Sequence, residues 1–124
     1  MGLVPWSPLA YGLLTGKYDR ATVEAGPARQ GGVPNEGGAA GARPEGDKRL
    51  DGDNPFADAL FTDRNWRIVD AVKRVAAEIG ETPARVALAW VVRRPGVAST
   101  LMGVSRPEQV SDNVSALGLI LPDE

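Results

Sequence analysis

Residues 100–113, TLMGVSRPEQVSDN, constrain the fold of this chain more than any other stretch. They open with the apolar run 100–102, which is too short for a helix and stops at Gly103, so it predicts a short buried strand. Ser105 and Glu108 then have the S-x-x-E spacing of a capping box. In that motif the serine hydroxyl accepts a hydrogen bond from the backbone N–H three residues on, and the glutamate reaches back to the serine N–H. The stretch therefore predicts a strand that runs directly into the N-terminus of a helix.

The residues that follow support this helix. Pro107 fits its first turn, because the N–H that proline lacks would have no partner inside the helix. Val110, Val114 and Leu117 recur at helical spacing and are expected to form its buried face.

The junction between this strand and this helix is a candidate ligand site. Unpaired N–H groups and the positive end of the helix dipole make such a junction a natural place for an anion. Arg106, Gln109 and Asn113 lie at its mouth and could bind a phosphate and a ring. The alternative is a well-capped connection that binds no ligand, as most capping boxes do.

A second junction of this kind is predicted near the start of the chain. Residues 2–6 form an apolar run that predicts a short buried strand, and Pro8 is expected to hold Ser7 in an extended conformation. Residues 12–18 form a glycine-framed apolar patch, which we expect to be a tight loop. A ligand phosphate could meet backbone N–H groups here, with Lys17 as an added charge. A surface connector is the alternative.

The next stretch, residues 21–54, is predicted to be a long flexible loop. It holds eight of the fifteen glycines and has no helical or strand periodicity. A loop of this length is usually either functional or disordered, and we expect it to be disordered in isolation and partly ordered over a bound ligand. Without it about 90 residues remain to build a core, which is small for a single compact domain.

Two helices are predicted after the loop. Thr62 or the aspartate after it is expected to cap the first, which stops at Gly80. Thr82 and Pro83 are expected to start the second as its N-cap and first helical residue. The residues expected on the buried sides are Trp66, Val69, Val72, Ala76 and Ile79 on the first helix and Val86, Ala89, Trp90 and Val92 on the second. Both tryptophans are expected to be core residues rather than platforms for a ligand.

The predicted order of strand, loop, two helices, strand and helix is typical of an α/β fold with a parallel sheet and helical crossovers. A net charge of −2 supplies no basic field for nucleic acid or anionic lipid. The strand between the helices of residues 82–117 also argues against a helix-turn-helix. The absence of cysteine and histidine leaves no thiolate or imidazole ligand for a metal site. With no signal peptide or membrane-spanning run, we expect a cytoplasmic chain.

Two segments together resemble the C-terminal third of an aldo-keto reductase. They are VPWSPLAYGLLTGKY, residues 4–18, and ALAWVVRRPGVASTLMGVSRPEQVSDN, residues 87–113. The resemblance is to the branch that includes potassium-channel β-subunits and bacterial aldo/keto reductases, and it is weakest over residues 21–48. It implies part of a (β/α)8 TIM barrel, the last two β/α units, with residues 3–6 and 100–102 as the seventh and eighth strands. Ligands of such barrels bind at the C-terminal ends of the strands.

The resemblance also implies that NADP(H) binds across this face and that the intact enzyme reduces a small aldehyde or ketone. Carried over by motif, the cofactor residues are Trp6 near the nicotinamide; Ser7, Pro8, Leu9, Ala10 and Tyr11 around the pyrophosphate, with Lys17 and Tyr18 close by; Gly103, Ser105, Arg106, Gln109, Asp112 and Asn113 at the adenosine half; and Arg49 as a further phosphate contact. NADP rather than NAD is expected because the adenosine 2′-phosphate would lie near Ser105 and Arg106.

The family's catalytic Asp, Tyr, Lys and His belong to the first half of the barrel and have no counterpart here. Such a barrel usually takes about 250 residues, so we expect a C-terminal fragment that is inactive alone and whose partner is the missing N-terminal portion of the barrel. A split gene, a truncated reading frame or an internal start would each produce it. The alternative is a non-catalytic module that binds a nucleotide or completes a barrel with another chain.

Overall fold

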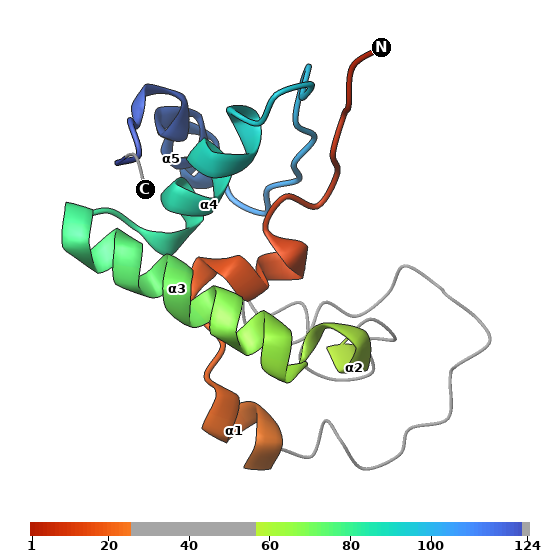
Figure 1. The fold of residues 1–124 in the computed structure, drawn as a ribbon, viewed down its shortest axis with the longest axis vertical. Helices are drawn as coiled ribbons and strands as arrows, with labels where there is room; N and C mark the ends of the chain where they lie inside the picture. The colour runs from red at the N-terminus through yellow and green to blue at the C-terminus, as the bar shows by residue number, and fades with distance from the viewer. Residues whose placement is uncertain (26–56, 123–124) are drawn as a thin grey trace.

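The computed structural model describes residues 1–25 and 57–122, which are mainly helical (Figure 1). The elements in chain order are the 3-10 helix η1 (Ala10–Thr15), α1 (Arg20–Ala25), α2 (Ala57–Leu60), α3 (Asp63–Ile79), α4 (Pro83–Val92), α5 (Glu108–Ser115) and the 3-10 helix η3 (Ala116–Gly118). Within these described ranges, no helix combines the length and apolarity needed to cross a membrane.

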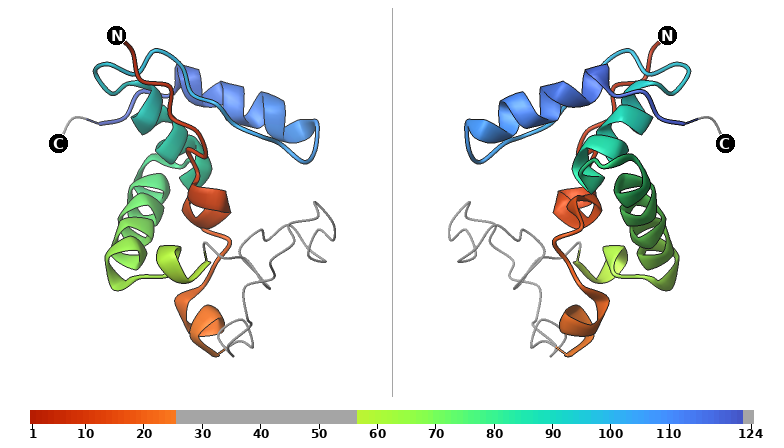
Figure 2. Two further views of the ribbon diagram at one scale, coloured as in Figure 1. Left: turned by 90° about the vertical axis from the view of Figure 1, so that its right-hand side faces the viewer. Right: turned by 90° about the vertical axis from the view of Figure 1, so that its left-hand side faces the viewer.

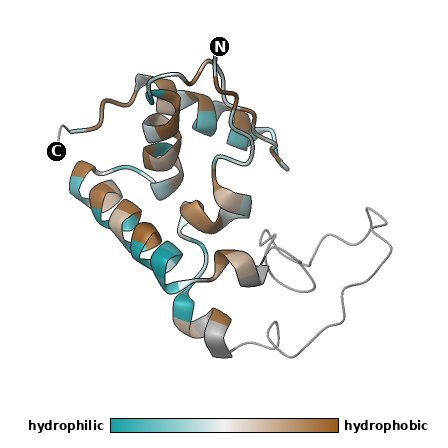
Figure 3. Ribbon diagram, turned by 45° about the vertical axis from the view of Figure 1, so that its right-hand side comes forward, coloured by the Kyte–Doolittle hydropathy of each residue, from teal (hydrophilic) through white to brown (hydrophobic). Residues whose placement is uncertain are grey.

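Helix α3 begins and ends where the sequence predicts. The Thr62 hydroxyl accepts a hydrogen bond from the Asn65 N–H at 3.2 Å, and Gly80 ends the helix in the left-handed conformation with φ of 70°. Trp66, Val69 and Ala76 are buried on one side of the helix, while charged residues cover the other, as the two-sided colouring of α3 in Figure 3 shows.

Helix α4 is also confirmed, with Thr82 as N-cap and Pro83 at its first position. It contacts α3, α5, η1 and η3 and so occupies the middle of the described structure. Four consecutive residues of α4, from Val86 to Ala89, are buried. Trp90 was predicted to be a core residue, and this prediction is wrong: Trp90 is 52% exposed, with the Arg94 guanidinium carbon 4.4 Å from its ring centroid.

A cluster of buried side chains joins η1 to the start of α3. It consists of Leu13, Tyr18, Val23, Phe61, Trp66 and Val69. Phe61 stacks on Trp66 with ring centroids 5.5 Å apart, and the edge of Tyr18 meets Phe61 at 5.8 Å. This aromatic cluster fixes the position of η1 beside α3.

The two predicted strands lie side by side and parallel, but neither forms a strand in the described residues. Among the described residues, one isolated bridge joins the two predicted strands, Trp6 to Leu101, and a second joins Leu3 to Val97, which precedes the predicted second strand. The prediction that both are buried is also wrong, because Leu3, Trp6 and Leu101 are 65%, 66% and 57% exposed. A parallel strand is normally buried between neighbours on both edges and under helices, and these segments have only each other among the described residues.

Helix α5 extends to one side of the molecule, as both views in Figure 2 show. The predicted buried face is exposed: Val110 and Val114 on α5 are 49% and 52% exposed, and Leu117 on η3, which follows α5, is 62% exposed. The spacing predicted an apolar face correctly, but spacing does not reveal whether a partner covers that face.

Two loop predictions need correction, and one short helix was not predicted. Residues 12–18 were expected to be a loop, but η1 covers the first four of them. The Gly12 and Leu14 N–H groups donate to the Leu9 carbonyl, and the Gly16 N–H donates to the Leu13 carbonyl. Helix α1 covers the start of the predicted loop 21–54, and its remainder lies outside the described residues. The short helix α2, which precedes the α3 N-cap, was not predicted.

We expect Gly16→Ala to destabilise the fold by about 1 kcal/mol more than Gly80→Ala. Both glycines have positive φ, 79° and 70°, so alanine is strained at either position. Only at Gly16 would the added Cβ lie 3.2 Å from Lys73 Cε on α3 and 3.2 Å from Pro83 Cγ on α4. Urea denaturation of the two variants measures the difference, and equal losses would show that η1 does not need this close approach.

Candidate cofactor site

The parallel pairing places the two predicted junctions on the same side of the molecule. The Leu101 N–H donates to the Pro5 carbonyl at 2.9 Å, so the chain leaves both segments next to each other, at Ser7 and at Met102. A cavity of about 530 Å³ lies beyond these two ends. Its volume is in the range of roughly 300–1,000 Å³ found for small-molecule and cofactor sites.

Most of the residues carried over from the resemblance line this one cavity. They are Trp6, Ser7, Pro8, Leu9, Tyr11, Lys17, Gly103, Ser105, Arg106, Gln109, Asp112 and Asn113. Ala10 and Tyr18 do not line it, and Tyr18 is buried in the aromatic cluster. Arg49 lies outside the described residues.

Six residues of the cavity wall were not predicted: Gly12, Thr15, Thr82, Ala84, Leu101 and Met102. Thr82 and Ala84 belong to the N-terminal turn of α4, which the sequence predicted only as a helix start. No local signal points this turn toward the junctions, because its position follows from the packing of α4 on η1 and α5.

The N-terminal wall has an unusual backbone. Ser7, Ala10 and Tyr11 have φ of 51°, 49° and 56°, each of which costs a non-glycine residue on the order of 1–3 kcal/mol. The prediction of an extended Ser7 is therefore wrong, because the chain reverses at once and the Ser7 carbonyl accepts the Ala10 N–H at 2.9 Å. The edge of Trp6 meets Tyr11 at a ring distance of 6.1 Å. Strain concentrated in one short loop is a common feature of binding sites.

Lys17 brings a positive charge to this wall. The Lys17 N–H donates to the Thr15 hydroxyl at 3.4 Å, and that hydroxyl donates to the Gly12 carbonyl at 2.6 Å. A Cβ on Gly12 would lie 2.8 Å from Lys17 Cε, so the lysine stem runs along space that only glycine leaves open. The ammonium is 5.8 Å from the centroid of the Tyr18 ring. Tyr18 therefore contributes to the site indirectly, as a buried ring beside the Lys17 ammonium.

The C-terminal wall is built differently from the predicted capping box. Helix α5 begins at Glu108, and its N-cap, Pro107, makes no side-chain cap. Gln109 has the reach-back role instead: its Oε1 accepts from the Ser105 N–H at 2.8 Å, the Ser105 hydroxyl at 3.2 Å and the Arg106 N–H at 3.2 Å. The helix starts later than Ser105 would require as N-cap, so the side chain that reaches back is one residue further along.

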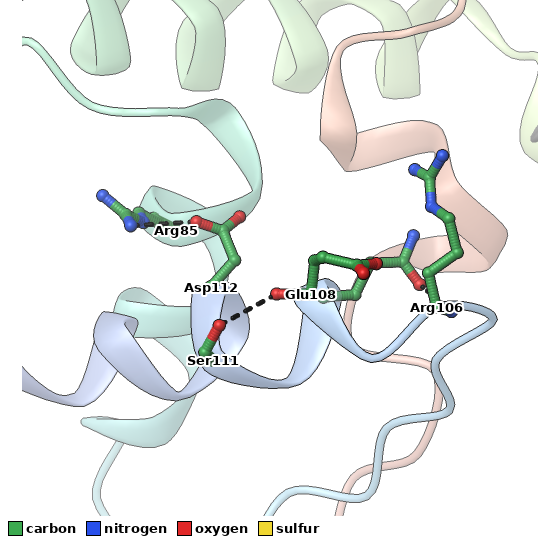
Figure 4. A pocket seen from close by; sticks show the side chains of 6 residues that line it. Arg85, Arg106, Glu108, Ser111 and Asp112 are labelled. Carbon is green, nitrogen blue, oxygen red and sulfur yellow. Dashed lines mark hydrogen bonds and ion pairs between the residues drawn. The ribbon is translucent and has the colours of Figure 1, made fainter.

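An ion pair links α4 and α5 beside the C-terminal wall of the cavity. Arg85 on α4 lies 2.9 Å from Asp112 on α5 and 3.0 Å from Glu81. The hydrogen bond to Glu81 raises the pKa of Arg85 above its ordinary value, and the charge of Asp112 adds to this. Figure 4 shows Arg85 directed at Asp112, while Arg106 extends away from both. A second open cavity, of about 560 Å³, shares Arg106, Gln109 and Asp112 with the first.

Taken together, the first cavity offers two cations, several hydroxyl and amide groups, and an exposed tryptophan face. Lysine and arginine bind phosphate groups, and an aromatic face can stack against a flat ring. The arrangement suits an elongated ligand that carries both phosphate and rings.

Comparisons with known proteins match nearly the whole chain. The model of the Aldo/keto reductase family matches residues 1–124. A protein of Arabidopsis thaliana named "Probable voltage-gated potassium channel subunit beta" is 32% identical over 120 residues, which cover 97% of this chain and 31% of that protein. The L-glyceraldehyde 3-phosphate reductase of Escherichia coli K12 is 32% identical over 117 residues, which cover 94% of this chain and 29% of that enzyme. The chain thus spans about three tenths of these relatives.

Proposed function

This chain belongs to the aldo/keto reductase family, whose fold is a TIM barrel, and from this premise we propose that it forms the NADP(H)-binding end of such a barrel. In this proposal residues 3–6 and 100–102 correspond to the last two barrel strands. The intact protein would reduce small aldehydes or ketones to alcohols.

The observation that carries the proposal is the single cavity on which both junctions converge. Two segments about 95 residues apart in sequence contribute most of the expected cofactor residues to it. The donor set also fits the group, because a dinucleotide presents phosphates to cations and N–H donors and rings to apolar walls.

Each part of the cavity has a proposed role. Trp6 would orient the nicotinamide, the strained backbone of residues 7–11 and Lys17 would bind the pyrophosphate, and Ser105, Gln109 and Asn113 would hold the adenosine half. When bound, the cofactor supplies the hydride that reduces the carbonyl carbon. These 124 residues would position it, and the tyrosine that donates the proton would come from elsewhere in the barrel.

A second candidate is a module that completes a barrel with another chain, with or without catalysis. The exposed apolar side chains of α5 and of the bridged segments favour it, because several large apolar residues there are about half exposed or more. Size-exclusion chromatography with candidate partner chains would test it.

We expect the purified chain to bind NADPH saturably, followed by energy transfer from tryptophan to the nicotinamide, and to consume no NADPH when an aldehyde is added. Lys17→Met should weaken binding about tenfold, since it removes a cation at the cavity. Lys73→Met on α3 is the matched control and should leave the affinity unchanged, because Lys73 does not line the cavity. Failure of the chain to bind NADPH would overturn the proposed cofactor-binding role. Consumption of NADPH by the chain alone would overturn the proposal that the catalytic residues come from elsewhere in the barrel.

A further inference from the structure

We propose that Arg85 sets the cofactor preference of this site by holding Asp112 and neutralising its charge, so that the adenosine end accepts a 2′-phosphate. The inference rests on the proposed cofactor role of the cavity. Arg85 is a positioning residue in this account, because it acts through Asp112 and not by contact with the cofactor.

The geometry of Arg85 fits this role. Its Nη1 donates to Glu81 Oε2 at 3.0 Å, and its Nη2 lies 2.9 Å from Asp112 Oδ1. Arg85 is in the first turn of α4 and Asp112 in the second turn of α5, so the ion pair links the two helices that frame the cavity. The arginine fork is planar, so the contact of Nη1 with Glu81 fixes the orientation of the guanidinium group whose Nη2 holds Asp112.

Asp112 connects this ion pair to a ligand. Its side chain is 48% exposed and lines both cavities, so a molecule in either one meets its carboxylate. A carboxylate beside an adenosine ribose accepts a hydrogen bond from the 2′-hydroxyl and repels a 2′-phosphate, whereas a nearby arginine accommodates the phosphate. Because Arg85 pairs with Asp112, the carboxylate charge that a 2′-phosphate would meet is neutralised.

The net charge of the residues that line the second cavity depends on Arg85. Arg85 and Arg106 line this cavity together with Glu108 and Asp112, two cations and two carboxylates, and Glu81 adds a third carboxylate next to Arg85. Removing Arg85 would leave Arg106 alone against these carboxylates. A dianionic phosphate would then meet a net negative wall, while an uncharged ribose hydroxyl would meet a free acceptor.

The test measures dissociation constants of NADPH and NADH for the purified chain and its variants. We expect Arg85→Ala to lower the preference for NADPH over NADH about tenfold at low ionic strength. Asp112→Asn in the Arg85→Ala background should restore the preference, because it removes the uncovered charge at nearly constant shape. Arg85→Lys should keep it. Arg74→Ala, which makes the same charge change at an exposed position on α3, should leave it unchanged.

Arg85→Gln, which keeps part of the stem without the charge, replaces Arg85→Ala if circular dichroism shows that the alanine variant is unfolded. An unchanged preference in the uncharged variant would overturn the inference. A loss that Asp112→Asn does not restore would also overturn it, because Arg85 would then bind the phosphate itself. If the unsubstituted chain binds neither cofactor, the proposed function fails and this inference fails with it.

Discussion

Replacing Trp66 with alanine is expected to lower the free energy of unfolding by about 3–5 kcal/mol. Trp66 is 4% exposed and stacks on Phe61 with an angle of 2° between the ring planes. Phe61 in turn contacts Tyr18, so the loss of one ring opens a cavity in the cluster that holds η1 against α3. A domain has a total stability of only about 5–15 kcal/mol. Cofactor binding should therefore be lost as well, since η1 carries much of the N-terminal wall.

Trp66→Phe is the matched control and should cost less than about 1.5 kcal/mol. It keeps an aromatic ring against Phe61 and removes an indole N–H that is buried without a hydrogen-bond partner among the described residues. Urea denaturation followed by circular dichroism measures both variants. Equal losses for alanine and phenylalanine would mean that the aromatic stack on Phe61 does not hold the core.

The helices α3 and α4 could be predicted because their ends depend on neighbouring residues. Thr62, Thr82, Pro83 and Gly80 each act within one helical turn, so the sequence contains the whole signal. Helix α5 was also predicted, but its cap was assigned to Ser105 and Glu108 when Gln109 supplies the acceptor. A shift of the helix start by a residue or two lies within the usual uncertainty of such boundaries.

Burial was harder to predict than the helices themselves. Val110, Val114 and Trp90 are apolar at helical spacing, yet all three are about half exposed. Leu3 and Leu101 were predicted to lie in buried strands, and a single bridge each is what they form. Apolar spacing shows which side of an element favours burial, but burial itself depends on what packs there, and that information is not local.

Most of the residues that line the candidate cavity could be predicted, for a specific reason. The two motifs that resemble the family carry most of the cavity wall, and the parallel bridge at Trp6 and Leu101 brings them together. The contributions of Thr82 and Ala84 could not be predicted, because they depend on how α4 packs. A residue before proline usually adopts an extended conformation, but Ser7 has a positive φ. This conformation depends on how the whole loop of residues 7–11 folds, so it could not be predicted from Pro8 alone.

Replacing Gln109 with glutamate should separate folding from cofactor binding. A glutamate can still accept from the Ser105 N–H, the Ser105 hydroxyl and the Arg106 N–H, which Gln109 now engages. Its stability should stay within about 1 kcal/mol of the unsubstituted chain. Its affinity for NADPH should fall about a hundredfold, because a fixed negative charge then occupies the junction where we place the phosphate.

Gln109→Leu should give the opposite pattern. It removes the acceptor of three donors, so the free energy of unfolding should fall by about 1–2 kcal/mol. Because the Ser105 and Arg106 N–H groups are then released from Gln109 and can donate to a phosphate, NADPH affinity should fall less than about tenfold. Denaturation and NADPH titration on both variants measure the two effects. If both variants lose affinity in proportion to stability, the junction at Ser105 only holds α5 in place and the cofactor phosphate binds elsewhere.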